Sequence, residues 1–180
     1  MFPLILTLKL DDATFILFDD LRQLYFPPER NLLSAHLTMF HHLPGEEIAQ
    51  VKEDLRRVCA EFDEFPLAFP EWRFLGKGVA AKVFAPELLN LRAELAAVWK
   101  DRLKPQDQQK FQPHITVQNK VAPDEARAVY EKLAAEPLPP NGTAKGVSLW
   151  HYLGGIWKLE DDFLFGAERT KREQTRKNAQ

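Results

Sequence analysis

Two short segments with the same arrangement of residue types carry most of the chemistry that this sequence suggests. One reads Ala35-His36-Leu37-Thr38-Met39-Phe40 and the other reads Pro113-His114-Ile115-Thr116-Val117. Residues two apart share a face of a β-strand, so each histidine is expected to point the same way as its threonine. The apolar residues between and after them, Leu37, Met39, Ile115 and Val117, should then face the core.

An imidazole and a hydroxyl on one strand face could act together on one substrate. The imidazole can move a proton near neutral pH, and the hydroxyl can hydrogen-bond an oxygen of the same ligand. A single motif of this kind is readily explained as a histidine at the edge of a core. Two copies 78 residues apart (114 − 36) weaken that explanation. Together they could supply an acid, a base and two oxygen-binding hydroxyls.

The composition is that of an ordinary globular protein without a large charge imbalance. The chain has 180 residues, of which 45% are hydrophobic, and a formal net charge of −2. This length suffices for one substantial domain or two small lobes. The charge argues against a globally basic nucleic-acid binder, so any anion site should be a local cleft. Cys59 is the only cysteine, which excludes an intrachain disulfide and suits a reducing cytosol.

The apolar start of the chain does not have the features of a secretory signal. It lacks a basic first segment, Lys9 interrupts it, and no small-residue cleavage site follows. We interpret it as an opening strand. No stretch of the sequence is long enough for a membrane span, so we expect a cytoplasmic protein without a membrane partner.

Hydrophobic spacing and turn residues predict alternating strands and helices in the first half. We expect a strand over 3–10, a helix over 12–25, the first motif strand over 32–41, a helix over 46–62, and strands over 66–75 and 78–84. Asp11 and Asp12 stand where a helix cap belongs. The segment Gly76-Lys77-Gly78 should join the last two strands as a hairpin.

The second half repeats this order of elements. We expect a helix over 86–103, a loop over 104–112, the second motif strand over 113–120, a helix from 123 to about 136, and a final hairpin over 143–152 and 155–165. These elements predict an α+β fold with two antiparallel sheets facing one central cleft and helices outside. The charged segment 166–180 lacks an apolar stripe and is expected to be a disordered tail.

The two motifs, His36-Leu37-Thr38-Met39 and His114-Ile115-Thr116-Val117, resemble the paired signatures of the two-histidine (2H) phosphoesterases, the 2′-5′ RNA ligase-like superfamily. The segment Tyr25-Phe26-Pro27-Pro28-Glu29-Arg30 is similar to the family's lead-in to its first motif. The runs Val147-Ser148-Leu149-Trp150, Ile156-Trp157-Lys158-Leu159 and Phe163-Leu164-Phe165 are similar to its terminal hairpin. The resemblance covers roughly residues 1–165.

This resemblance implies a single bilobal domain over 1–165, whose lobes are related by a pseudo-twofold axis and interleaved around the motif strands. It implies hydrolysis of a 2′,3′-cyclic phosphate, at an RNA end or in a small nucleotide, without a metal or a cofactor. One neutral histidine would take the proton of water, and one protonated histidine would supply the leaving oxygen. Thr38 and Thr116 would bind phosphoryl oxygens. The resemblance suggests His114 as base and His36 as acid, although the local sequences are near-equivalent.

Other side chains are candidates for contact with the rest of the substrate. Aromatic and histidine rings can stack on bases in RNA sites, and cations can supply positive charge to a cleft. The candidates are Tyr25, Arg30, Trp72, Lys82, Trp150 and His151. Packing inside the fold is the competing explanation for the aromatic residues and for His151.

The signatures of several other enzyme classes are missing from the sequence. Neither motif has a nearby ligand partner at zinc spacing, and there is no G-x-S-x-G elbow or P-loop. Two alternatives within the resemblance stay open. The same site in reverse would join a 2′,3′-cyclic end to a 5′-hydroxyl as a 2′-5′ RNA ligase, and a non-catalytic module would bind RNA ends without turnover. Nothing implies an obligate protein partner.

Overall fold

Alternation along the first strand creates a sheet with one apolar and one partly polar face. The computed structural model describes residues 2–166, and its strand β1 (Leu4–Leu10) buries four leucines on one side. Ile5, Thr7 and Lys9 occupy the other side, because successive side chains of a strand point to opposite faces. This second face carries the candidate site.

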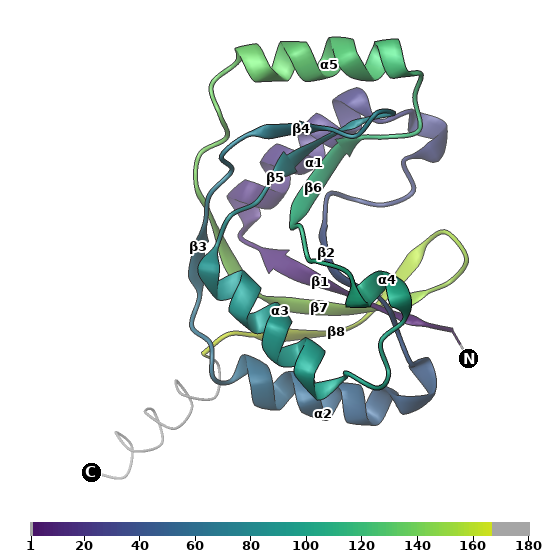
Figure 1. The fold of residues 1–180 in the computed structure, drawn as a ribbon, viewed down its shortest axis with the longest axis vertical. Coiled ribbons are helices and arrows are strands. Elements are labelled where there is room, and N and C mark those ends of the chain that lie inside the picture. Colours follow the sequence, from purple (N-terminus) through teal and green to yellow (C-terminus); the bar gives the residue numbers. More distant parts are fainter. Residues whose placement is uncertain (1, 167–180) are drawn as a thin grey trace.

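Two antiparallel sheets make up the strand content of residues 2–166 (Figure 1). In the larger sheet, the strand order is β2-β1-β7-β3, and β8 also pairs with β7. Its further strands are β2 (Leu37–Leu43), β3 (Phe65–Leu67), β7 (Gly142–Tyr152) and β8 (Trp157–Leu164). The smaller sheet has the order β4-β5-β6 and consists of β4 (Trp72–Phe74), β5 (Val79–Lys82) and β6 (His114–Gln118).

Helices lie on the outside of both sheets (Figure 1). They are α1 (Asp12–Tyr25), α2 (Ile48–Cys59), α3 (Pro86–Val98), the short α4 (Pro105–Gln108) and α5 (Pro123–Ala135), with 3-10 turns at Pro28–Arg30 and Gly45–Glu47. The carboxylate of Asp11 caps α1 by accepting the backbone N–H of Thr14 at 3.0 Å, as predicted. The predicted α+β fold of two antiparallel sheets is therefore confirmed.

The helices cross over between the two sheets. Helix α1 precedes the first motif strand β2 in sequence, yet it packs against β6 of the smaller sheet together with α5. Helix α3 precedes the second motif strand β6, yet it packs against α2 beneath the larger sheet. Each motif strand is therefore supported by both halves of the chain.

Three local predictions were wrong, and the tertiary structure explains each. The predicted strand 66–75 is divided between the sheets, because Pro70 has no N–H for a continuous ladder. The expected loop 104–112 contains α4. The first motif strand begins at Leu37 rather than at residue 32, since side chains of α1 hold the preceding segment in an irregular path. Of the predicted tail, residues 167–180 lie outside the described part of the chain.

Candidate active site

The two motif strands meet at the boundary between the sheets. β2 forms one edge of the larger sheet and β6 forms one edge of the smaller sheet, and the two strands contact each other. The four apolar residues of the motifs, Leu37, Met39, Ile115 and Val117, are buried as the alternation predicts. The fold therefore brings the two motifs together from positions 78 residues apart (114 − 36).

Both histidines are held by the same local contact. Nδ1 of His36 lies 2.7 Å from the carbonyl oxygen of Ser34, and Nδ1 of His114 lies 2.8 Å from that of Gln112. A carbonyl can only accept, so Nδ1 carries the hydrogen in each ring. This contact leaves Nε2 of each ring available to a substrate, and Nε2 carries a lone pair whenever the ring is neutral.

The surroundings of His36 favour its neutral form. Burial is the main cause that lowers the pKa of His36 to about 4; the nearby charge of Arg22 also lowers it, and the bond to Ser34 acts in the opposite direction. The ring also contacts Trp157, with the ring centroids 4.7 Å apart. A neutral His36 at pH 7 is suited to accept a proton.

The motif threonines are available to a ligand. Thr38 and Thr116 are both partly buried, and within residues 2–166 neither hydroxyl has a hydrogen-bond partner. Thr38 lies opposite Thr7 on β1, and Thr116 lies opposite Ala80 on β5. A hydroxyl at a site of this kind can donate to a phosphoryl oxygen without breaking an existing bond.

Two cations share the sheet face that carries His114. Lys82 lies directly opposite His114, and Arg73 lies opposite Ala80, which itself faces Thr116. Directly opposed residues of antiparallel strands project from the same face. Arg73 donates to the side-chain oxygen of Gln112 at 2.7 Å, and Lys82 is paired with Glu71. This side of the site is largely exposed; Glu71 offsets the charge of Lys82, whereas Arg73 has no carboxylate partner among residues 2–166.

Two buried arginines connect helices of one half of the chain to the motif strand of the other half. Arg22 of α1 donates to the carbonyl of Thr116 at 3.0 Å and to that of Leu33 at 2.9 Å. Arg92 of α3 donates to the carbonyl of Met39 at 2.8 Å. Burial lowers the pKa of Arg22 to about 10, so the side chain stays charged at neutral pH. Arg22 thus links β6 to α1, the helix that precedes β2 in sequence, and Arg92 links β2 to α3, the helix that precedes β6.

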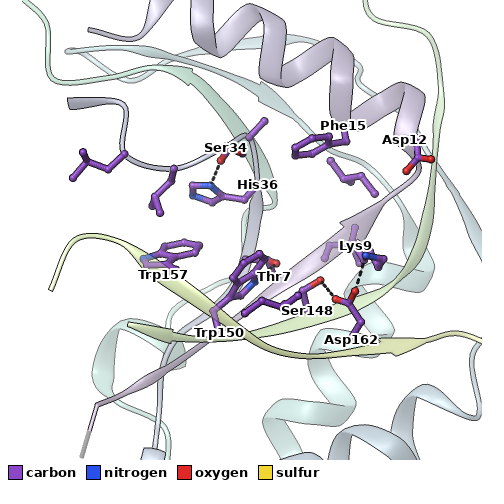
Figure 2. A pocket seen from close by; sticks show the side chains of 16 residues that line it. Thr7, Lys9, Asp12, Phe15, Ser34, His36, Ser148, Trp150, Trp157 and Asp162 are labelled. Carbon is purple, nitrogen blue, oxygen red and sulfur yellow. Dashed lines mark hydrogen bonds and ion pairs between the residues drawn. The ribbon is translucent and has the colours of Figure 1, made fainter. Parts of the chain in front are cut away.

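A cavity of about 490 Å³ opens beside His36 (Figure 2). Side chains of the larger sheet line one side, and Phe15 of α1 with the segment 32–35 lines the other. The sheet residues include Thr7, Lys9, Ser148, Trp150, Trp157 and Asp162. His114 is not among the lining residues, so the cavity extends to one side of the histidine pair.

Two of the six predicted substrate-binding residues lie beside the motifs. Trp150 lines the cavity, and its indole N–H donates to the hydroxyl of Thr7 at 2.9 Å. Lys82 is the neighbour of His114 described above. A role of Trp150 and Lys82 in substrate binding therefore stays a prediction, which substitution of each residue can test.

The other four predicted residues do not line the cavity. Tyr25 packs against the core under the ammonium group of Lys132, 5.5 Å from its ring. Trp72 is buried against Phe18. Arg30 donates to the carbonyl of Lys120 at 3.2 Å.

His151 lies opposite Leu4, on the other face of the larger sheet from Thr7. There its ring contacts Glu160 at 3.1 Å. These contacts account for the positions of Tyr25, Trp72, Arg30 and His151 without a substrate.

The cavity also contains residues that the sequence analysis did not select. They are Thr7, Lys9, Ser148, Trp157 and Asp162. The alternation of Thr7 and Lys9 with leucines was a usable signal, because polar residues at every second position mark the second face of a strand. For Ser148 and Asp162 the signal was absent, since their significance depends on the pairing of β7 with β8.

Comparisons with known proteins assign the chain to a family. The model of the 2′-5′ RNA ligase superfamily matches residues 10–156, and the chain therefore belongs to this superfamily, the 2H phosphoesterases. Its members are phosphoesterase and ligase enzymes. Among curated proteins, none matches the chain.

Solved structures share the fold at low sequence identity. The protein TT0787 of Thermus thermophilus superposes with a TM-score of 0.67 at 18% identity, over 91% of this chain and 98% of that one. E. coli LigT in complex with phosphate gives a TM-score of 0.56 at 16% identity, over 91% and 97%. E. coli LigT in complex with 3′-AMP gives a TM-score of 0.56 at 16% sequence identity, over 91% of this chain and 98% of that one.

Residues 2–166 were also compared with the requirements of membrane helices and metal sites. None of their helices combines the length and apolar composition that crossing a bilayer requires. No three or more histidine, cysteine, aspartate or glutamate side chains of this region gather where they could hold a metal ion.

Proposed function

We propose that this protein hydrolyses 2′,3′-cyclic phosphates, at RNA ends or in small nucleotides, by acid–base catalysis with His36 and His114. The observation that supports this most strongly is the matched orientation of the two rings. Each Nδ1 is held by the carbonyl two residues earlier, which leaves two Nε2 atoms on contacting strands for one substrate. No step of the proposed reaction needs a metal ion or a cofactor.

The reaction opens the cyclic ester by in-line displacement. A water oxygen forms a bond to phosphorus while the bond from phosphorus to the 2′- or 3′-oxygen breaks. One Nε2 takes the proton of the water, and the protonated Nε2 of the other ring gives a proton to the leaving oxygen. The product is a phosphomonoester with a free neighbouring hydroxyl. Each proton transfer by a positioned side chain typically contributes about 10²–10⁴-fold in rate.

Thr38 and Thr116 would stabilise the negative charge that grows on the phosphoryl oxygens. Their hydroxyls have no partner within the described region, so they can donate without first losing a bond. Fixed donors of this kind are worth more in a partly buried site than in water. Arg73 and Lys82, on the His114 side, would add positive charge at the same position.

The division of roles depends on what substrate binding does to His36. The resemblance suggests His36 as the acid, yet burial and the charge of Arg22 favour its neutral form. A cyclic phosphate carries a negative charge, and an opposite charge within a few ångströms favours a protonated imidazole. We therefore propose that substrate binding protonates His36, which then donates to the leaving oxygen while His114 accepts from water.

Ligation of RNA is the second candidate, because the family includes it and the same groups would serve in reverse. A 5′-hydroxyl would replace water, and the product would be a 2′-5′ phosphodiester. The cationic, exposed side of the site around Arg73 and Lys82 is where such a strand would approach.

The deciding experiment offers purified protein a panel of substrates in parallel. It consists of the four nucleoside 2′,3′-cyclic phosphates, an RNA oligomer with a cyclic end, that oligomer with a 5′-hydroxyl partner strand, and ADP-ribose cyclic phosphate. Hydrolysis followed by ³¹P NMR, unaffected by dialysis against a chelator, is the expected result. Joined strands without hydrolysis would establish ligation instead. Tight binding without either product would establish the non-catalytic alternative.

We also propose that the protein works in a reducing compartment such as the cytoplasm. Cys59, the only cysteine of the sequence, is buried. A single cysteine cannot form an intrachain disulfide, and chains without disulfides are usual in reducing compartments.

A further inference from the structure

A row of polar side chains crosses the larger sheet from the active site into the cavity. Thr38 lies opposite Thr7, Thr7 lies opposite Ser148, and Ser148 lies opposite Asp162. Directly opposed residues share a face, so the four strands present three hydroxyls and a carboxylate in succession. Thr7 is 3% exposed and Ser148 is 5% exposed. Buried polar groups are costly in a core that is only structural.

The far end of this row presents a hydrogen-bond donor beside an acceptor. The ammonium group of Lys9 lies 2.8 Å from Oδ2 of Asp162, and the hydroxyl of Ser148 donates to the other oxygen. Lys9 retains further N–H donors, and each carboxylate oxygen retains a lone pair. Figure 2 shows this group at the opposite end of the cavity from His36. A ligand edge with neighbouring donor and acceptor atoms would match it.

Aromatic rings line the space between the two ends. Trp157 contacts His36, and Trp150 lies next to it with ring centroids 6.3 Å apart. Phe15 of α1 lies across the cavity in Figure 2 and is 38% exposed. Leu32 and Leu159 also line the cavity and are exposed. Such apolar surface beside polar groups is typical of a small-molecule site.

We propose that this cavity binds the nucleoside of the substrate, with the base against Trp150 and Trp157 and its polar edge at Lys9 and Asp162. The inference rests on the proposed function, and it adds which part of the substrate is recognised and by which residues. The volume of about 490 Å³ lies within the range of ligand pockets. Every nucleobase can stack, and each has a polar edge for the Lys9–Asp162 pair.

The position of the cavity is consistent with the proposed reaction. It adjoins His36 and not His114, so the nucleoside lies on one side of the phosphate. The leaving oxygen belongs to that nucleoside and then lies beside His36. Water would attack from the opposite side, towards His114, as in-line displacement requires.

The test compares substrates with and without a base. Wild-type protein is given the four nucleoside 2′,3′-cyclic phosphates and methyl ribofuranoside 2,3-cyclic phosphate, which has the same reacting ring and no base. We expect kcat/KM to be higher for the nucleotides by about 5- to 100-fold, the range that stacking of one base provides. Equal values would overturn the base-binding proposal and leave the proposed function intact.

Two variants locate the effect in the cavity. In Trp150→Leu and in Lys9→Gln, the ratio of kcat/KM for nucleotide over base-free substrate should fall towards one. Lys145→Gln is the matched control, because Lys145 makes a similar ion pair with Glu64 at 2.6 Å and does not line the cavity. The control should keep the wild-type ratio. An unchanged ratio in both cavity variants would contradict the assignment.

A binding measurement separates this inference from the reaction itself. Calorimetry compares nucleoside 3′-monophosphates with inorganic phosphate on wild-type protein and on Lys9→Gln. Tighter binding of the nucleotide, reduced by the substitution, supports the cavity even if no cyclic phosphate is turned over. Failure of hydrolysis with this binding pattern would count against the proposed function alone. Equal affinity for nucleotide and phosphate would count against the cavity.

Discussion

The two motif histidines have the same local geometry and different surroundings. In both, Nδ1 is fixed by the carbonyl two residues earlier, at 2.7 Å for His36 and 2.8 Å for His114. His36 lies against Trp157 beside a cavity built on the larger sheet. His114 lies at the edge of a sheet of three short strands, opposite the exposed Lys82.

The two motifs therefore share the contacts made close to each histidine in sequence and differ in the strands packed around them. The shared geometry comes from residues within each motif, which a repeat carries with it. The surroundings come from long-range partners, which differ because only the first motif belongs to a sheet with β7 and β8. In the proposed reaction, this difference gives the His36 side to the nucleoside and the His114 side to the attacking group.

The largest effect should come from removing either histidine. His36→Ala and His114→Ala should each lower turnover of a cyclic phosphate by about 10²–10⁴-fold, because each removes one proton-transfer group. His42→Ala is the control, since His42 is an exposed histidine of the same strand β2. Steady-state kinetics, with circular dichroism to verify folding, provides the measurement. Wild-type turnover in either His36→Ala or His114→Ala would contradict the proposal that both histidines transfer protons.

Substituting each buried arginine shows how much its contact with a motif strand contributes to the free energy of unfolding. Arg22→Met leaves the carbonyls of Thr116 and Leu33 without their donor, and Arg92→Met leaves that of Met39. Each should lower the free energy of unfolding by about 2–4 kcal/mol, because unsatisfied buried acceptors are costly. Arg56→Met, at an exposed position, should change it by less than about 0.5 kcal/mol. Urea denaturation measures all three, and a neutral Arg22→Met would show that the lobes do not depend on this contact.

The motif threonines should have smaller and similar effects. Thr38→Val and Thr116→Val keep the side-chain shape and remove the hydroxyl. We expect kcat to fall by about 10- to 10²-fold in each, the value of a hydrogen bond to a charged group. The comparison is sharpened by measuring both variants with the same substrate. A loss confined to one threonine would show that only one lobe binds the phosphoryl oxygens.

The smallest effect concerns the pH dependence of stability. The pKa of His36 is about 4 in the folded chain and about 6.5 in an unfolded one. Between these values the unfolded state binds more protons, so stability is full above pH 6.5 and is lost as pH falls towards 4. His36→Gln removes this contribution.

The matching measurement is urea unfolding of wild type and His36→Gln at pH 4.5 and pH 7. From pH 7 to pH 4.5, the free energy of unfolding should fall by about 1 kcal/mol more in the wild type than in His36→Gln, after allowance for screening at this partly exposed ring. An identical pH dependence would contradict the low pKa of His36.

Much of the fold and the centre of the site were predictable because they depend on short-range patterns. The alternation Leu37-Thr38-Met39 and Ile115-Thr116-Val117 is a local property, and its apolar members are buried as expected. The cap at Asp11 and the hairpin of β4 and β5 also follow from neighbouring residues. The spacing of hydrophobic residues and the positions of turn-forming residues are enough to predict such features.

The remainder of the site depends on strand register, which no local pattern encodes. Ser148 and Asp162 meet only because β7 pairs with β8, and Thr7 joins them only because β1 pairs with β7. The anchoring of Thr116 by Arg22 spans 94 residues. The place of Trp157 in the cavity has the same origin, since it depends on the pairing of β8 with β7.

The central claim is that both histidines contact one phosphate group, and NMR titration tests it most directly. The ring Cε1–H signals of His36 and His114 are assigned from the two alanine variants and followed as inorganic phosphate or a nucleoside 3′-monophosphate is added. We predict that both signals shift with one common dissociation constant, and that the pKa of His36 rises from its low value in the free protein. A shift of only one histidine, or two different dissociation constants, would contradict the account.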